Sequence, residues 1–239
     1  MTDLETISTL KLLDIKPEAG NVKTFIFETG GLTWIAGQSQ RYILPQAGTT
    51  KAETERRFTI ATAPSEGVIS VSARISESTF KQALNALKPG DLIQRKSLKG
   101  DFTWEEEPSE PLVLVAGGIG VTPYRAILLE RDAWSKKIPA TLLYFNRTDE
   151  IPFLEEFKSL AAKHPEFNLV PIVGESITAE NIFKHLPDYV IQAGAPQSSK
   201  QTIYLSGPEP MVETVGEELK KLGINIKQDW FSGYDEKNY

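Results

Sequence analysis

The chain has 239 residues, 40% of them hydrophobic, which is long enough for one or two domains with cores of their own. Its formal net charge of -6 and its lack of a dense Lys/Arg block argue against binding to nucleic acid or to an anionic membrane. The absence of cysteine excludes disulfides, thiolate catalysis, an all-cysteine iron–sulfur cluster and cysteine-based zinc sites.

The N-terminal residues and the longest apolar runs indicate where in the cell the protein is expected. The chain starts without the basic and apolar stretches of a signal peptide, and no apolar run reaches the roughly 18 residues that a membrane span needs. We therefore expect a cytoplasmic protein with no membrane partner. The two histidines, His164 and His185, stand near the ends of helical patterns, so we expect no metal site.

The N-terminal part, up to residue 104, has the pattern of an antiparallel β structure. Short β-rich stretches alternate with Gly/Pro turns over residues 4–76, which is typical of a sandwich or barrel. A single helix is predicted over 78–91, with Ser78 and Thr79 as candidate caps, and further strand follows at 91–104.

The composition changes at residues 105–111, "EEEPSEP", which we interpret as a solvated linker between two domains. We place one domain at residues 1–108 and the other at residues 109–239. In the second domain, apolar strand-like runs alternate with helical patterns, which predicts a parallel α/β unit with helices on both faces of its sheet. A flexible polar loop is expected at 192–201.

A glycine-rich turn follows the first strand of this second unit, in "LVLVAGGIGVTP" (residues 112–123). Gly117, Gly118 and Gly120 lack the dinucleotide fingerprint, because Pro123 stands where a third glycine would be. Pro123 suits the first helical position, with Thr122 as its cap. Taken alone, the turn is equally consistent with a phosphate cradle at a helix N-terminus and with a plain tight connection.

Two other stretches favour the cradle. "ERRFTIATAP" (residues 55–64) lies in the β part, and "IYLSGPEPMVETV" (residues 203–215) forms another strand–glycine–helix junction. Since ligands of an open parallel sheet bind at the carboxyl ends of its strands, both glycine junctions should face one crevice.

The order and spacing of these motifs resemble the ferredoxin–NADP reductase family over essentially the whole chain. The family's flavin motif matches Arg56 to Thr59, its pyridine-nucleotide loop matches Gly117 to Pro123, and its "CGPxPM" motif matches Ser206 to Met211. The resemblance implies an N-terminal antiparallel Greek-key β-barrel that binds FAD, with one capping helix. It also implies a C-terminal parallel α/β domain that binds NADPH or NADH.

The resemblance assigns FAD contacts to the first domain. Arg56 would pair with the pyrophosphate, Phe58 would lie against the isoalloxazine where the family more often has Tyr, and Thr59 would stand near flavin N5. Further expected FAD contacts, for which a surface arginine and ordinary capping are equally good interpretations, are Arg74, Ser76, Ser78 and Thr79.

The resemblance also assigns contacts with the nicotinamide nucleotide to the second domain. The glycine loop and Thr122 would hold its diphosphate, and Gly207 and Pro208 would border the nicotinamide. Ser206 replaces the cysteine frequent in the family, and we expect activity to persist with altered rate or affinity. Arg147 would bind the 2′-phosphate of NADP, Asp149 and Glu150 would equally well bind the ribose of NAD, and a plain surface arginine is an equally good interpretation of Arg147, so the coenzyme stays open.

The aromatic tail "QDWFSGYDEKNY" matches a family ending that covers the flavin. Phe231 and Tyr234 are the candidates, with Trp230 and Tyr239 behind them, and packing against the barrel is the alternative. The cover would have to move for hydride transfer.

The function that the resemblance implies is hydride transfer from NADPH or NADH to flavin N5, with Thr59, Ser206 and Phe231 at the reacting atoms. Electrons would pass to a separate acceptor such as ferredoxin, flavodoxin or an oxygenase component. Three alternatives stay open: a reductase of free flavin, quinones or ferric chelates, a non-catalytic flavin- or nucleotide-binding regulatory module, and an α/β domain of unrelated function.

Overall fold

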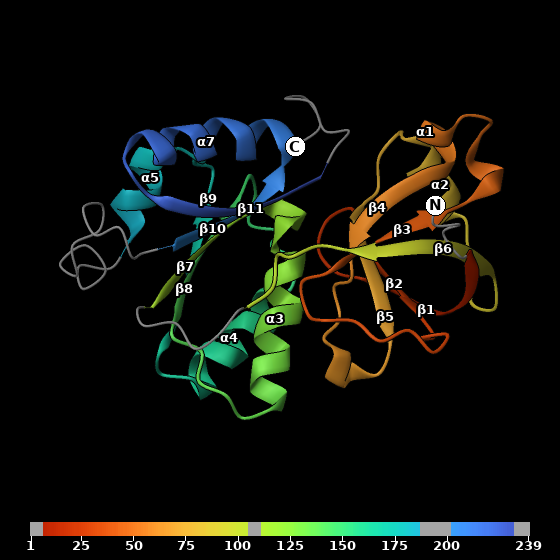
Figure 1. Cartoon of the computed structure of the whole chain (residues 1–239), viewed down its shortest axis with the longest axis horizontal. Helices are drawn as coiled ribbons and strands as arrows, with labels where there is room; N and C mark the ends of the chain where they lie inside the picture. Colours follow the sequence, from red (N-terminus) through yellow and green to blue (C-terminus); the bar gives the residue numbers. More distant parts are fainter. Residues whose placement is uncertain (1–6, 105–110, 187–201, 232–239) are drawn as a thin grey trace, which may run out of the picture.

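The computed structural model describes residues 7–104, 111–186 and 202–231, and their strands form two separate sheets (Figure 1). The N-terminal sheet has six strands in the order β4-β3-β6-β1-β2-β5, and all its pairs are antiparallel. The last strand, β6, returns to lie beside the first, β1, which is a connection of the Greek-key type. These strands are β1 (Ser8–Pro17), β2 (Val22–Phe27), β3 (Ser39–Ile43), β4 (Glu55–Thr59), β5 (Ile69–Arg74) and β6 (Leu92–Lys99).

The core of this half follows from alternation along the strands. Leu10 and Leu12 of β1 are buried while their neighbours are exposed, because successive side chains of a strand point to opposite faces. The expected helix is α2 (Thr79–Asn85), which contributes Phe80 and Leu84 to the core. A single helical turn, α1 (Lys51–Thr54), was not predicted. It begins with a capping box between Thr50 and Glu53.

The C-terminal sheet has five parallel strands in the order β11-β10-β7-β8-β9. They are β7 (Leu112–Gly117), β8 (Ala140–Asn146), β9 (Phe167–Val173), β10 (Thr202–Pro208) and β11 (Asn225–Phe231). Its helices are α3 (Thr122–Ala133), α4 (Leu154–Lys163), α5 (Ala179–His185) and α7 (Glu209–Lys221). In Figure 1, α3 and α4 cover one face and α5 and α7 the other, and each face has its own apolar core. The predicted two-part fold is confirmed.

The strand order reverses at β7, whose neighbours are β8 on one side and β10 on the other. A crevice opens at the carboxyl ends of parallel strands where the order reverses in this way. The glycine turn, as the 3-10 helix η3 (Gly118–Val121), occupies this position.

The predicted cap of α3 is wrong. Thr122 is the first residue of the helix rather than its cap, because η3 runs directly into α3 and Val121 takes the cap position. The hydroxyl of Thr122 donates a hydrogen bond to the carbonyl oxygen of Ile119 at 3.2 Å. At α2, Ser78 does occupy the cap position, without a side-chain capping bond.

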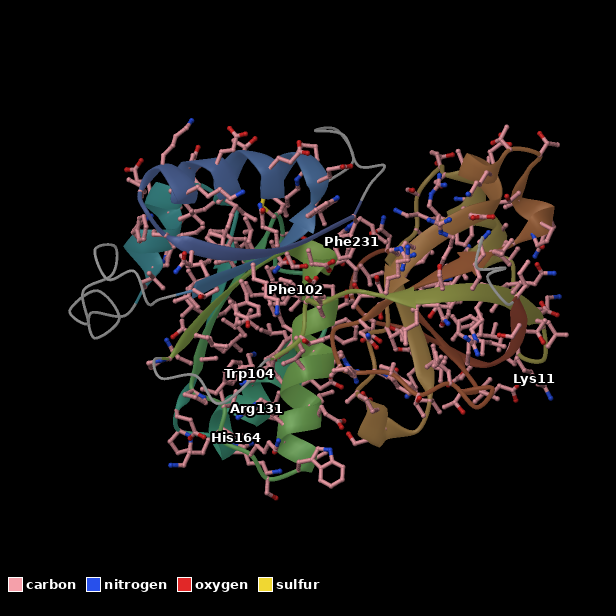
Figure 2. The ribbon with its side chains drawn as sticks, viewed as in Figure 1. Lys11, Phe102, Trp104, Arg131, His164 and Phe231 are labelled. Carbon is pink, nitrogen blue, oxygen red and sulfur yellow. The ribbon has the colours of Figure 1, made fainter. Side chains whose placement is uncertain are left out.

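The segment that leaves β6 packs into the C-terminal half. The Phe102 ring lies 5.6 Å from the ring of Tyr124 and 5.4 Å from that of Tyr204, and Arg131 stacks over Trp104 at 4.3 Å (Figure 2). The two halves are therefore joined through packed side chains before residue 105. The domain boundary that we predict at residue 108 and the polar loop at 192–201 lie outside the described residues.

Candidate functional site

A cleft of about 1490 Å³ lies between the two halves of the chain. This exceeds the roughly 300–1,000 Å³ of an ordinary small-ligand site, so there is room for more than one ligand. Most of the predicted site residues line it: Arg56, Phe58, Thr59, Arg74, Ser76, Ser78, Thr79, Gly117, Gly118, Thr122, Arg147, Pro208 and Phe231. Gly120, Ser206 and Gly207 are outside this lining, and Tyr234 and Tyr239 lie outside the described residues.

Strand β4 forms the wall on the N-terminal side. The Phe58 ring is half-buried, with its centroid 5.8 Å from that of Phe80 and 6.2 Å from that of Tyr42. The Arg56 guanidinium donates to the carbonyl oxygens of Glu55, at 2.9 Å, and Ala52. No carboxylate of the described residues pairs with Arg56, so its charge is not neutralised by an ion pair there. The wall therefore combines an aromatic ring with a cation.

The same wall continues at the end of β5. Arg74 donates to the side-chain oxygen of Asn21 at 2.8 Å, and the Asn21 amide donates to the carbonyl oxygen of Ile75 at 2.9 Å. These hydrogen bonds orient a second guanidinium at the edge of the cleft. The segment from Ser76 to Thr79 then leads into α2 along the cleft.

Thr59 and Asp229 meet where β4 approaches the last strand. The Thr59 hydroxyl, 3% exposed, donates to Oδ2 of Asp229 at 3.4 Å across 170 residues of chain. Burial raises the pKa of Asp229 to about 7, with Asp101 adding to the rise and the Thr59 hydroxyl and Arg57 opposing it. The pair can therefore hold or release a proton near neutral pH.

Asp229 was missed by the sequence analysis, which took the segment around it as an aromatic tail. The one local signal is an acidic side chain between Gln228 and Trp230 in a stretch patterned as a strand. Its neighbour Trp230, a lower-ranked candidate for the flavin cover, is 52% exposed. Alternation explains this, because Trp230 points to the face opposite Asp229 and Phe231.

The glycine turn forms the wall on the C-terminal side, and its glycines differ in function. Gly118 has a φ of +52°, and a Cβ there would meet nothing within 4 Å, so it leaves open backbone at the cleft. A Cβ on Gly117 would lie 3.0 Å from side-chain atoms of Ile177 and Met211. Gly120 packs on the neighbouring strand instead, since its Cβ would lie 2.4 Å from the carbonyl oxygen of Ser206.

Ser206 is buried and does not line the cleft. Its side chain is 0% exposed and its hydroxyl has no hydrogen-bond partner among the described residues. Gly120 covers the Ser206 backbone, and Gly207 is covered by Met211, whose Cε would lie 2.4 Å from an added Cβ. Of this junction, Pro208 is the predicted residue that reaches the cleft.

The far end of the C-terminal wall carries charges of both signs. Arg147 and Glu150 follow β8, and Glu175 follows β9. Hydrogen bonds from His185 and Lys184, both at 3.1 Å, lower the pKa of Glu175, so that it is ionised at neutral pH. Asp149, considered with Glu150 for the ribose, is not in the cleft lining.

Phe231 ends β11 opposite Pro208 of β10 and lines the cleft. Figure 2 shows it at the edge of the C-terminal half that faces the N-terminal half. Over the described residues, no group of three or more His, Asp or Glu side chains could hold a metal ion, and no helix is long and apolar enough to cross a membrane.

Comparisons with known proteins bear on both halves. The model of the oxidoreductase NAD-binding domain matches residues 114–217. The chain is 28% identical over 190 residues to the NADH oxidoreductase HCR of Escherichia coli strain K12, covering 76% of this chain and 56% of that protein. It is 29% identical over 144 residues to NADH-cytochrome b5 reductase 2 of Mycosarcoma maydis, covering 55% of this chain and 39% of that protein. The chain thus spans about half the length of the curated relatives it matches.

Solved structures share the whole arrangement. A ferredoxin NADP+ reductase from Neisseria gonorrhoeae with bound FAD and NADP has a TM-score of 0.74 at 17% identity, covering 93% of this chain and 98% of that one. The flavohemoglobin of Malassezia yamatoensis with bound FAD and heme has a TM-score of 0.72 at 20% identity, covering 95% and 60%. The chain therefore matches an oxidoreductase NAD-binding domain over residues 114–217 and has the two-part fold of these reductases.

Proposed function

We propose that the chain binds FAD and NADH or NADPH in the cleft between its halves and transfers a hydride from the nicotinamide to the flavin. The observation that carries this proposal is that one cleft is lined by Phe58 and Thr59 of the first half and by the glycine turn of the second. A reaction between two bound molecules needs both of them to be held at one place, which this arrangement supplies.

The residues of the N-terminal wall fit a flavin dinucleotide. Phe58 offers an aromatic face to a flat ring system, and the cations of Arg56 and Arg74 suit a diphosphate. Ser76, Ser78 and Thr79 add hydroxyl groups on the same wall. The reductase from Neisseria gonorrhoeae and the flavohemoglobin, which share the fold, hold FAD.

The C-terminal wall fits the nicotinamide nucleotide. Gly117 and Gly118 line the cleft ahead of α3, a helix of twelve residues, and Gly118 leaves open backbone there. A helix N-terminus attracts a diphosphate. Arg147 suits the 2′-phosphate of NADPH, and Glu150 and Glu175 suit the ribose hydroxyls of NADH, so the proposal covers both coenzymes.

The chain's own part in the chemistry is to orient the reactants and to place a proton. Bound FAD supplies the two-electron carrier. The Thr59 hydroxyl, held by Asp229, donates or accepts a hydrogen bond where the two walls meet, and Asp229 keeps a proton available near pH 7. Phe231 lines the cleft at the end of β11, and as a cover over the flavin it would have to turn aside when the nicotinamide enters.

Electrons then leave to a separate acceptor, for which ferredoxin, flavodoxin or an oxygenase component are the candidates. Relatives named cytochrome b5 reductase and flavohemoprotein support electron delivery to a protein or a heme. This chain contains no cysteine with which to build an iron–sulfur centre of its own.

Purified protein tests the proposal directly. Protein mixed with FAD and passed over a desalting column should stay yellow, and anaerobic NADH or NADPH should bleach its flavin absorbance. Colourless protein after this treatment would reject the flavin site. If the protein retains flavin but neither nucleotide bleaches it, the chain is a flavin-binding module and the proposed enzymatic activity is rejected. Added ferredoxin, flavodoxin, free flavin, a quinone or ferric citrate should then re-oxidise the reduced protein, and the fastest of these identifies the acceptor class.

A further inference from the structure

One buried arginine outside the cleft joins the two halves of the chain. Arg125 lies on α3 in the C-terminal half, and its side chain is 11% exposed. Its guanidinium binds Glu66 of the N-terminal half, through Nη1 and Nη2 at 3.0 Å each. It also binds Glu156 of α4, through Nε at 2.7 Å and Nη2 at 2.8 Å.

A third partner, the backbone carbonyl of Ala61, completes the set. Nη1 of Arg125 donates to the carbonyl oxygen of Ala61 at 2.7 Å. A guanidinium has five N–H donors, and these five hydrogen bonds match that number. Burial lowers the pKa of Arg125, but the carboxylates of Glu156 and Glu66 raise it by more, so the group keeps its charge. Two bidentate carboxylates, one from each half, fix the guanidinium in orientation as well as in distance.

Arg125 and its partner Ala61 each lie close in sequence to a residue of one cleft wall. Arg125 is three residues after Thr122, the cleft residue that follows the glycine turn, and Ala61 is two residues after Thr59. The guanidinium therefore ties the peptide just beyond the Thr59 strand to the first turn of the helix that starts at the glycine turn.

Neighbouring contacts hold the same two segments together. The amide of Ser65 donates to Oε2 of Glu130, one turn beyond Arg125 on α3, at 2.9 Å. Gly37 lies so close to α3 that an added Cβ would be 3.0 Å from Cδ1 of Ile127. Helix α3 is thus an element of the C-terminal half that docks on the N-terminal half, as Figure 1 shows.

We propose that Arg125 is a positioning residue for hydride transfer: by holding Ala61 and Glu66 it sets the distance between the Thr59 wall and the glycine turn. This inference rests on the proposed function. A displacement of about 1 Å between reacting groups can cost up to 100-fold in rate, so a link that spans the two walls acts on the reaction without touching a ligand.

The two carboxylates give a pair of variants; Glu66 also accepts a hydrogen bond from the Ala63 amide at 2.6 Å, which the side-chain oxygen of glutamine can still accept. Glu66→Gln and Glu156→Gln each remove one charged, bidentate partner of Arg125, yet only Glu66 belongs to the N-terminal half. Their side chains are 30% and 40% exposed, so each can be changed without leaving a deeply buried hole. Glu156 is not in the cleft lining, and neither is Glu66.

The experiment measures flavin reduction by stopped flow over a range of NADH or NADPH concentrations, together with hydrogen exchange of the FAD-loaded protein. Glu66→Gln should lower the limiting rate of reduction about tenfold or more while the nucleotide Kd stays at the parent value. It should also speed the exchange of the backbone amides of Ser65, Glu66 and Gly67. Glu156→Gln should keep the parent's limiting rate and the parent's exchange in this segment.

Arg125→Lys is a second variant, because a lysine cannot form the paired bonds to either carboxylate. It should behave like Glu66→Gln. Equal limiting rates in the two glutamine variants, or a loss that appears only in the nucleotide Kd, would overturn the proposal. A parent protein whose flavin is not reduced at all rejects the proposed function instead, and the exchange data then still show whether Glu66 holds the segment.

Discussion

Replacing Asp229 with asparagine should change how the stability of the protein depends on pH. The pKa of Asp229 in the folded chain is raised from 3.8 to about 7, chiefly by burial. Between these two values the folded state keeps a proton that the unfolded state has released. Stability therefore falls as the pH rises through this range and levels off above pH 7. Asparagine cannot ionise, so the stability of the variant should not fall in this way as the pH rises.

The size of the effect follows from the raised pKa. Each pH unit in this range costs the parent about 1.4 kcal/mol in the free energy of unfolding. From pH 5.5 to pH 7 the upper limit is therefore about 2 kcal/mol, and since Asp229 keeps some contact with solvent we expect about 1–2 kcal/mol. The amide oxygen of the introduced asparagine can still accept the Thr59 hydrogen bond, so the fold should persist.

The assay is urea unfolding of flavin-free protein at intervals from pH 5.5 to pH 8.5. The free energy of unfolding of Asp229→Asn should rise relative to that of the parent up to about pH 7. Above pH 7 the difference between the two proteins should stay constant. Asp14→Asn, a change of an exposed side chain on β1, is the control and should follow the parent at every pH. Parallel curves for the parent and Asp229→Asn would refute the reasoning, because they would show no proton held at Asp229 in the folded state.

Further predictions concern the two walls of the cleft. Arg56→Ala should lower the ratio of FAD to protein that survives gel filtration, and a ratio equal to the parent's counts against this contact. Gly118→Ala should cost about 1–2 kcal/mol in the free energy of unfolding, because its φ is +52°, and should raise the Kd for NADH or NADPH. Gly120→Ala should cost about 1–3 kcal/mol, because its Cβ would lie 2.4 Å from the carbonyl oxygen of Ser206. Nucleotide binding that weakens equally in both glycine variants, measured by calorimetry, would contradict their separate functions. Phe231→Ala should speed the reduction of the flavin by opening the cleft, and an unchanged stopped-flow rate would show that this ring does not shield the site.

The fold was predictable because its signals are local. Short β-rich stretches separated by Gly/Pro turns in residues 4–76 predicted antiparallel strands, and the alternation of strands and helices after Pro111 predicted the parallel sheet. The prediction that Thr122 caps α3 was wrong because the local sequence is ambiguous. A hydroxyl residue before Pro123 suits either a helix cap or the end of a 3-10 turn.

The site was predictable in its motifs and less so in its detail. Thr59 and Gly118 both line the cleft, as expected. Ser206 has the same strand-end position as a cleft residue, but the close approach of Gly120 covers its backbone, and no sequence pattern encodes that approach.

Two residues of the account depend on contacts between distant parts of the chain. Asp229 acquires its raised pKa from burial beside Thr59, which is 170 residues away. Arg125 is a single charged residue in an apolar helical stretch, and its partners come from η2 (Pro64–Glu66) and α4. Such pairings become visible only after the two halves are placed together.

The central claim is that one cleft holds a flavin and a nicotinamide close enough for direct hydride transfer. A single-turnover reaction of FAD-loaded protein with NADH or NADPH deuterated at C4 tests it most directly, under anaerobic conditions with absorbance as the readout. We expect the flavin to be bleached, and deuterium on the transferred face of the nicotinamide to slow the bleaching. A bound flavin whose spectrum neither nucleotide changes would contradict this claim.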